Sequence, residues 1–295
     1  MDYKKTNAPL NTVTRDMIEM SQDTGNVYET VSIIAKRANQ ISVDIKSELE
    51  KKLQENEVAA VILEPVQSNG PKEGYLDSVK ELAHKYGAIL IFDEVVSGFH
   101  YALGGAQEMF KVEPDLVAFG KGNGYPISAV AGKRELLEQI EQGVFISTTF
   151  GGDSIAMAAS LATLDILAEP GYYDHITKIG TMIRDGIQER IDKYDLNDVL
   201  AVSGLPAHCG IAFEGHGSLS YLDIQSVYSQ TMIQNGILVF AIYFLNKHHT
   251  EKEVQAYLDA TDKAFALIRK AIDEDSVDGI LLGGKVDPVF KRNIK

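Results

Sequence analysis

Residues 88–95 read Ala88-Ile-Leu-Ile-Phe-Asp93-Glu94-Val95, an apolar run that ends at two carboxylates. A short apolar run bounded by glycine and charge predicts a strand that is buried on both faces. Two similar runs are residues 58–63, followed by Glu64, and residues 115–119, followed after one glycine by Lys121. Because ligands of open α/β sheets bind beyond the carboxyl ends of the strands, we expect Asp93 and Lys121 to meet at one edge.

A carboxylate and a primary amine at one sheet edge suit pyridoxal phosphate (PLP) chemistry. Lys121 would hold the cofactor aldehyde as a Schiff base, and Asp93 would keep the ring nitrogen protonated so that the ring accepts electrons. An acid at a strand end is by itself more often a solvated terminus. The interpretation therefore depends on Asp93 and Lys121 occurring together.

The composition is that of an acidic α/β protein. The 295 residues are 45% hydrophobic, enough for one or two domains, and the formal net charge is −14. We expect no nucleic-acid partner, because the sequence lacks a basic stripe, and no membrane association, because no apolar run has the length of a membrane helix. The first residues lack the apolar core of a signal peptide, and the single cysteine, Cys209, favours a cytoplasmic location.

The pattern of expected strands and helices changes at Pro170. Before it, strands alternate with expected helices at residues 76–86, 134–142 and 154–167, which predicts a mostly parallel sheet. The helix at 154–167 is rich in Ala and Met, and we expect it to pack in the interior. After Pro170, a long amphipathic helix precedes a mixture of strands and helices. We therefore expect a partial large PLP-binding domain over residues 1–170 and a small α+β domain over residues 171–295.

Two other kinds of site match less well. The strand that ends at Asp93 resembles the magnesium-binding strand of a P-loop ATPase, but no Gly-x-x-x-x-Gly-Lys-Ser/Thr loop occurs in the sequence. A metal site formed by Glu64, Asp93 and Glu94 is a further alternative. The seven histidines show no ligand spacing, so we expect no metal.

The order and spacing of six segments resemble the class-III PLP-dependent aminotransferases, in particular the subgroup similar to glutamate-1-semialdehyde aminomutase. The segments are Ala60-Val-Ile-Leu-Glu-Pro-Val66, Ile91-Phe-Asp-Glu-Val-Val-Ser-Gly-Phe99, Glu113-Pro-Asp-Leu116, Phe119-Gly-Lys121, Asn123-Gly-Tyr-Pro-Ile127 and Thr148-Thr-Phe-Gly-Gly152. The resemblance covers residues 45–295. It implies the PLP-dependent transferase fold type I, with a large α/β domain around a mostly parallel sheet and a smaller C-terminal α+β domain.

The resemblance also implies roles for five residues. Lys121 would carry PLP and later shuttle the proton, Asp93 would pair with the pyridinium nitrogen, and Val95 would lie against one ring face. Glu64 would lie on the substrate side. Thr149 would reach the cofactor phosphate of the neighbouring subunit, which implies a homodimer with shared active sites. The turn of residues 149–152 precedes an expected helix, and helix N-termini favour phosphate.

Two departures from the family pattern leave alternatives open. The family usually has three residues between its lysine and a following Asn-Gly or Gly-Gly pair, whereas Gly122 alone separates Lys121 from Asn123. The amino-terminal phosphate loop of the family is largely missing, and residues 23–26 are either a remnant of it or an ordinary helix cap. We therefore expect PLP to be held less firmly than in a complete family member.

The expected activity is transfer of an amino group between a small-molecule amino donor and an aldehyde or keto acceptor. Two alternatives remain. One is an intramolecular 2,1-aminomutase similar to glutamate-1-semialdehyde aminomutase. The other is a catalytically degenerate or truncated relative that acts as an interaction subunit. No arginine stands out as a ligand for a substrate carboxylate, so the sequence does not identify the substrate.

Overall fold

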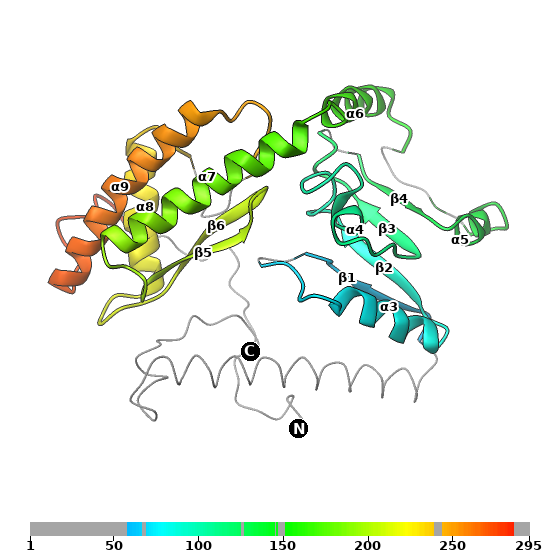
Figure 1. The fold of residues 1–295 in the computed structure, drawn as a ribbon, viewed down its shortest axis with the longest axis horizontal. Coiled ribbons are helices and arrows are strands. Elements are labelled where there is room, and N and C mark those ends of the chain that lie inside the picture. Colours follow the sequence, from blue (N-terminus) through cyan, green and yellow to red (C-terminus); the bar gives the residue numbers. More distant parts are fainter. Residues whose placement is uncertain are drawn as a thin grey trace. The chain divides into compact units, whose positions relative to one another are not determined.

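The fold is described from a computed structural model of the chain. The structure describes residues 58–66, 69–124, 127–144, 146, 151–238 and 244–285. They divide into two compact units (Figure 1). The first contains the described residues up to 178 together with residues 244–247, and the second contains the other described residues.

The first unit is built on a four-stranded sheet with the order β1-β2-β3-β4. The strands are β1 (Ala60–Leu63), β2 (Ile89–Glu94), β3 (Leu116–Phe119) and β4 (Ala129–Gly132). β1, β2 and β3 are parallel neighbours, and β4 runs antiparallel to β3. The predicted mostly parallel sheet is therefore present, and the carboxyl ends of β1, β2 and β3 lie at one edge.

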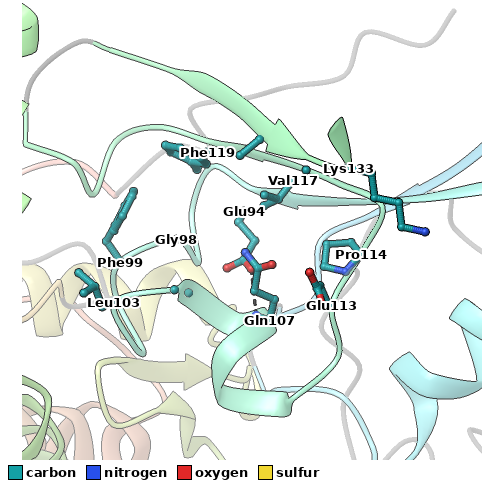
Figure 2. A pocket seen from close by; sticks show the side chains of 14 residues that line it. Glu94, Gly98, Phe99, Leu103, Gln107, Glu113, Pro114, Val117, Phe119 and Lys133 are labelled. Carbon is teal, nitrogen blue, oxygen red and sulfur yellow. Dashed lines mark hydrogen bonds between the residues drawn. The ribbon is translucent and has the colours of Figure 1, made fainter. Parts of the chain in front are cut away.

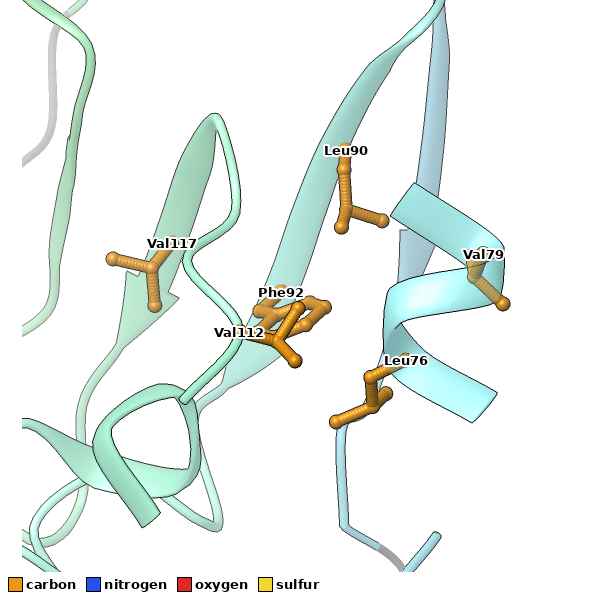
Figure 3. Close-up of a cluster of buried hydrophobic side chains, with 6 residues drawn as sticks. All are labelled: Leu76, Val79, Leu90, Phe92, Val112 and Val117. Atoms are coloured by element: carbon orange, nitrogen blue, oxygen red, sulfur yellow. The ribbon is translucent and has the colours of Figure 1, made fainter. Parts of the chain in front are cut away.

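One face of this sheet forms the core of the unit. Helix α3 (Tyr75–Lys85) joins β1 to β2, and helix α4 (Gly105–Phe110) precedes β3. The apolar side chains of α3 pack on the sheet, and the segment after α4 packs against the same cluster (Figure 3). The buried members, each at most 8% exposed, are Leu76, Val79, Leu90, Phe92, Val112 and Val117. Burying a side chain as large as Phe92 contributes about 2–3 kcal/mol.

The opposite face of the sheet is more open. Side chains alternate along a strand, so Asp93 projects away from the buried Phe92. Asp93 pairs in register with Ala118, and Ala118 pairs with Val130, which is 57% exposed. Ile62 of β1, on the same face, is 63% exposed. We call the surface of Ile62, Asp93, Ala118 and Val130 the Asp93 face. Burial on both faces was therefore the wrong expectation for the described residues, because α3 and α4 cover only one face.

The later helices of the first unit are α5 (Arg134–Leu137), the 3-10 helix η2 (Glu138–Ile140) and α6 (Ser154–Leu167). The expectation that α6 packs in the interior is wrong for its described surroundings. Only Ala156, Ser160 and Leu167 are buried, whereas Ile155 is 71% and Leu161 is 64% exposed. The apolar residues of α6 lie on several sides of the helix, but only a narrow stripe of them is buried.

The second unit is α+β. Helix α7 (Tyr172–Lys193) begins in the first unit, and the division falls inside it, between residues 178 and 179. The hairpin β5 (Leu200–Leu205) and β6 (His208–Phe213) is followed by α8 (Tyr221–Gln234) and α9 (Glu251–Glu274). The buried hydroxyls of Tyr228 and Tyr257 lie 2.7 Å apart between α8 and α9. None of the described helices is long and apolar enough to cross a membrane.

Candidate active site

Asp93 lies at the carboxyl end of β2, half-buried on the Asp93 face. The backbone N–H of Val95 donates a hydrogen bond of 3.1 Å to its Oδ1. The described residues give this carboxylate no other hydrogen bond or ion pair. Its Oδ2 is therefore available to a cationic or proton-bearing partner.

The next residue, Glu94, has a different role. Its side chain enters the core side of the sheet, and the residue is 1% exposed. Oε2 accepts hydrogen bonds from the Ser97 hydroxyl at 3.0 Å and the Ala106 N–H at 2.6 Å. Oε1 accepts one from the Gln107 N–H at 3.0 Å, and Figure 2 shows Glu94 beside Gln107. Glu94 thus satisfies backbone donors at the start of α4, which is a structural role.

Lys121 lies in a tight turn just beyond β3. The N–H of Gly124 donates to the Lys121 carbonyl at 3.1 Å, which closes the turn. Lys121 is exposed and has a φ of 48°, in the left-handed region that side chains rarely adopt. Backbone outliers of this kind concentrate at functional sites.

The Lys121 turn, residues 121–124, is held between two neighbours. A Cβ added at Gly122 would lie 2.6 Å from the carbonyl oxygen of Gly98, and one at Gly124 would lie 2.3 Å from the Thr163 hydroxyl of α6. Asn123 is 3% exposed, and its Nδ2 donates to the Ile127 carbonyl at 3.0 Å. The sequence analysis assigned Asn123 no role of its own. The available signals were its place two residues after Lys121 and its position at the start of one of the segments that resemble the family.

The turn after β2 packs against the Lys121 turn, because the Gly98 carbonyl lies next to Gly122. The rings of Phe99 and Phe119 meet edge to face, with their centroids 5.3 Å apart. Phe99 also has a left-handed φ of 65°, and the Tyr173 hydroxyl donates to its carbonyl at 3.2 Å. Burial raises the pKa of Tyr173, so the hydroxyl keeps its proton and remains a donor. Two strained backbones, at Phe99 and Lys121, therefore lie at the same edge.

The structure brings four of the five predicted site residues to this edge. Glu64 follows β1, Asp93 and Val95 lie at the end of β2, and Lys121 follows β3, and these strands are parallel neighbours. Glu64 is exposed and Val95 is half-buried. The fifth residue, Thr149, lies outside the described residues, as does the segment 23–26.

The start of α6 bears on the predicted phosphate site. The carboxylate of Asp153 accepts a hydrogen bond of 2.8 Å from the N–H of Ala156 and caps the helix. This N-terminus therefore already carries a negative charge, which repels a second anion.

A cavity of about 390 Å³ lies on the opposite face of the sheet from Asp93 (Figure 2). Phe99, Leu103, Val117 and Phe119 give it apolar walls, and Glu94 lies between them. Asp93, Val95 and Lys121 do not line it. In the part of the chain that the structure describes, no group of three or more His, Cys, Asp or Glu side chains is placed to hold a metal ion.

The family described as aminotransferase class-III matches residues 7–260. A curated glutamate-1-semialdehyde 2,1-aminomutase from Methanothrix thermoacetophila is 43% identical over 173 residues, which cover 56% of this chain and 40% of that protein. The chain thus spans well under two thirds of the length of this relative.

Solved structures share the fold. The FumI protein of Sphingopyxis sp. MTA144, in its PLP internal aldimine form, matches with a TM-score of 0.68 and 25% identity over 77% of this chain and 56% of that chain. An omega-transaminase from Sphaerobacter thermophilus matches with a TM-score of 0.64 and 25% identity over 71% and 52%. The ornithine delta-aminotransferase of Plasmodium falciparum, 23% identical with a TM-score of 0.65 over 76% and 61%, is similar in fold.

Proposed function

Because this chain belongs to the aminotransferase class-III family and has the fold of PLP-dependent transaminases, we propose that it transfers amino groups between a small-molecule donor and an aldehyde or keto acceptor. One observation carries the proposal. Asp93 and Lys121 leave the carboxyl ends of adjacent parallel strands, where open α/β sheets bind their ligands. A carboxylate and an amine at this edge match the two polar groups that PLP chemistry requires.

The described residues fit PLP at three points. Asp93 offers an oxygen without a partner among them, which suits a protonated ring nitrogen. Lys121 offers an exposed primary amine, and Val95 offers a half-buried apolar side chain for the ring face. The phosphate contact that we assign to Thr149 lies outside the described residues and remains a prediction.

Bound PLP would supply an aldehyde that takes up amino groups and a ring that accepts the electron pair of a neighbouring C–H bond. Lys121 would hold the cofactor through its primary amine and would serve as the group that moves a proton to and from the substrate carbon. Asp93 would keep the ring nitrogen protonated. Glu64, exposed beyond β1, lies on the side that we assign to substrate.

A 2,1-aminomutase is the second candidate, and the 43% identical relative of that name favours it. The two activities differ in their need for an acceptor. A mutase converts one compound without any co-substrate, whereas a transaminase stops after one half-reaction unless a keto or aldehyde acceptor is added. Turnover with and without the acceptor separates them.

We also propose a cytoplasmic homodimer that shares its active sites through Thr149. Ile155 and Leu161 expose apolar surface on α6, which suits a covering subunit. The one cysteine, Cys209, is buried, and burial raises the pKa of its thiol to about 11, as expected of an inert thiol in a reducing compartment. Sedimentation of the purified chain with PLP tests the dimer, and a monomer that retains PLP contradicts it.

The decisive experiment is an absorbance spectrum of the purified chain with PLP, before and after borohydride, followed by peptide mass mapping. We expect a visible band that borohydride removes and a reduced adduct on Lys121. Lys121→Arg, which keeps the charge, should lose both. An adduct on another lysine with Lys121 unmodified contradicts the assignment. Absence of band and adduct would instead favour the interaction-subunit alternative.

A further inference from the structure

We infer that Asn123 is the positioning residue of Lys121, an inference that rests on the proposed function. Lys121, Gly122, Asn123 and Gly124 form the tight turn that follows β3. Within the turn, Lys121 is exposed and Asn123 is 3% exposed. Asn123 is therefore the one side chain of this turn that is held by the body of the unit.

Asn123 ties the turn to the chain that follows it. Its Nδ2 donates to the Ile127 carbonyl, just before β4, at 3.0 Å. The Cβ position of Gly120, the residue before Lys121, lies 3.5 Å from the same carbonyl oxygen. The side chain thus closes a loop from the exit of β3 to the entry of β4, and Lys121 lies between these points.

The glycines on either side of Asn123 can fill space but cannot hold the turn. Gly122 lies against the Gly98 carbonyl and Gly124 lies against Thr163. These contacts block movement toward the protein, but they include no side-chain hydrogen bond from the turn. The Asn123 amide supplies that bond, and it opposes relaxation of Lys121 from its left-handed φ of 48°.

The second polar atom of Asn123 points to a role beyond local stability. Oδ1 is buried and has no hydrogen-bond partner among the described residues. A buried acceptor without a donor is costly, and such groups in native proteins are often explained by function. An apolar side chain or a glycine would avoid this cost. The presence of an amide at this position is accounted for if its hydrogen bond to Ile127 is needed to position Lys121.

The test uses the full chain and the reactivity of individual lysines. Parent, Asn123→Ala and Asn123→Asp are incubated briefly with PLP, reduced with borohydride and mapped by peptide mass. The readout is the ratio of adduct on Lys121 to adduct on Lys111, an exposed lysine at the end of α4. Asn123→Asp has nearly the parent's shape, but an ionised carboxylate cannot donate to Ile127.

Asn235→Ala is the control. It removes a hydrogen bond of the same kind, from a side-chain amide to a backbone carbonyl, because Asn235 Nδ2 donates to the Thr231 carbonyl in the second unit.

We expect both Asn123 variants to lower this ratio about tenfold, the effect of one lost hydrogen bond at a buried position, while Asn235→Ala leaves it unchanged. A merely structural role would lower the melting temperature without changing the ratio in the folded protein. An unchanged ratio in folded Asn123 variants therefore overturns the inference and leaves the proposed function intact. A parent chain that is not labelled at Lys121 overturns both.

If neither variant folds, hydrogen exchange of the parent decides. A turn held by Asn123 should protect the Gly124 N–H, which donates to the Lys121 carbonyl, about as well as neighbouring strand amides. Exchange of Gly124 at the rate of an open loop would contradict the inference.

Discussion

Asp93 and Glu94 are consecutive carboxylates at the end of β2 that leave the sheet on opposite faces. Glu94 is 1% exposed and accepts three hydrogen bonds, two of them from the start of α4. Asp93 is half-buried and accepts one, from the Val95 N–H. The alternation of the strand thus assigns one acid to the fold and leaves the other available for chemistry.

We predict that Asp93→Asn lowers turnover while the fold is preserved. Asn keeps an oxygen for the Val95 N–H but has no charge to hold a proton on the ring nitrogen. Loss of about 3 kcal/mol of charge-assisted pairing corresponds to a fall of about a hundredfold or more in kcat. Steady-state kinetics measure this, and urea unfolding monitors the fold. If Asp93→Asn turns over within a few-fold of the parent, Asp93 does not pair with the cofactor.

We predict that Glu94→Gln lowers stability but leaves the reactivity of Lys121 toward PLP unchanged. The amide keeps one oxygen acceptor and places N–H donors where the other carboxylate oxygen accepted, either from Ser97 and Ala106 or from Gln107. We expect the free energy of unfolding to fall by about 2–4 kcal/mol, measured in urea. The Lys121 adduct should still form in the variant that remains folded. Loss of the adduct with unchanged stability would move the catalytic role from Asp93 to Glu94.

Much of the sheet could be predicted from the sequence because its signals are local. Apolar runs that end at charge located β1, β2 and β3, and the rule for parallel sheets placed Glu64, Asp93 and Lys121 at one edge. Which of Asp93 and Glu94 faces the core was not predictable from composition, since both follow the same run. The strand-edge argument and the resemblance both assigned Asp93 the site role, and strand alternation is a physical argument in favour of that choice.

Features that depend on packing between distant segments were missed. Residues 58–63 and 88–95 resemble strands buried on both faces, yet the described helices cover only one face. The role of Asn123 depends on Ile127 and on burial that no local pattern encodes. α6 is mostly apolar, and the sequence alone does not tell a buried helix from an exposed one.

We predict that Gly122→Ala displaces the Lys121 turn. The added methyl group would lie 2.6 Å from the Gly98 carbonyl oxygen, and this backbone is itself held because the Gly98 N–H donates to Glu94 O at 2.8 Å. Neither side can yield easily, so we expect a cost of about 1–3 kcal/mol in unfolding free energy and reduced labelling of Lys121 by PLP. Gly283→Ala is the control, because nothing lies within 4 Å of its Cβ position. Normal labelling of Lys121 in Gly122→Ala would show that the turn tolerates displacement.

At the opposite edge of the sheet, Asp115 ties several elements together. Its carboxylate, 3% exposed, accepts hydrogen bonds from the Leu90 N–H at 2.6 Å and His84 Nε2 at 2.7 Å, and it pairs with Lys133 Nζ at 2.6 Å. Burial raises the pKa of Asp115, but the hydrogen bonds from Lys133, Leu90 and His84 outweigh it and lower the pKa from 3.8 to about 2.

This shift predicts an acid-dependent loss of stability with a definite sign. A carboxyl group whose pKa is lower in the folded state stabilises the fold above its unfolded pKa, and the contribution is lost as the pH falls through the folded value. For Asp115 the window runs from 3.8 down to about 2. The contribution at neutral pH is about 2–3 kcal/mol at 1.36 kcal/mol per unit of pKa.

Asp115→Asn should therefore destabilise the chain at pH 7 and flatten the dependence of unfolding free energy on pH between about 4 and 2. Asp77→Asn, at an exposed position of α3 in the same unit, should keep the parent's slope. Urea unfolding at a series of pH values measures both, and an Asp115→Asn slope equal to that of the parent would exclude Asp115 as the source of acid sensitivity.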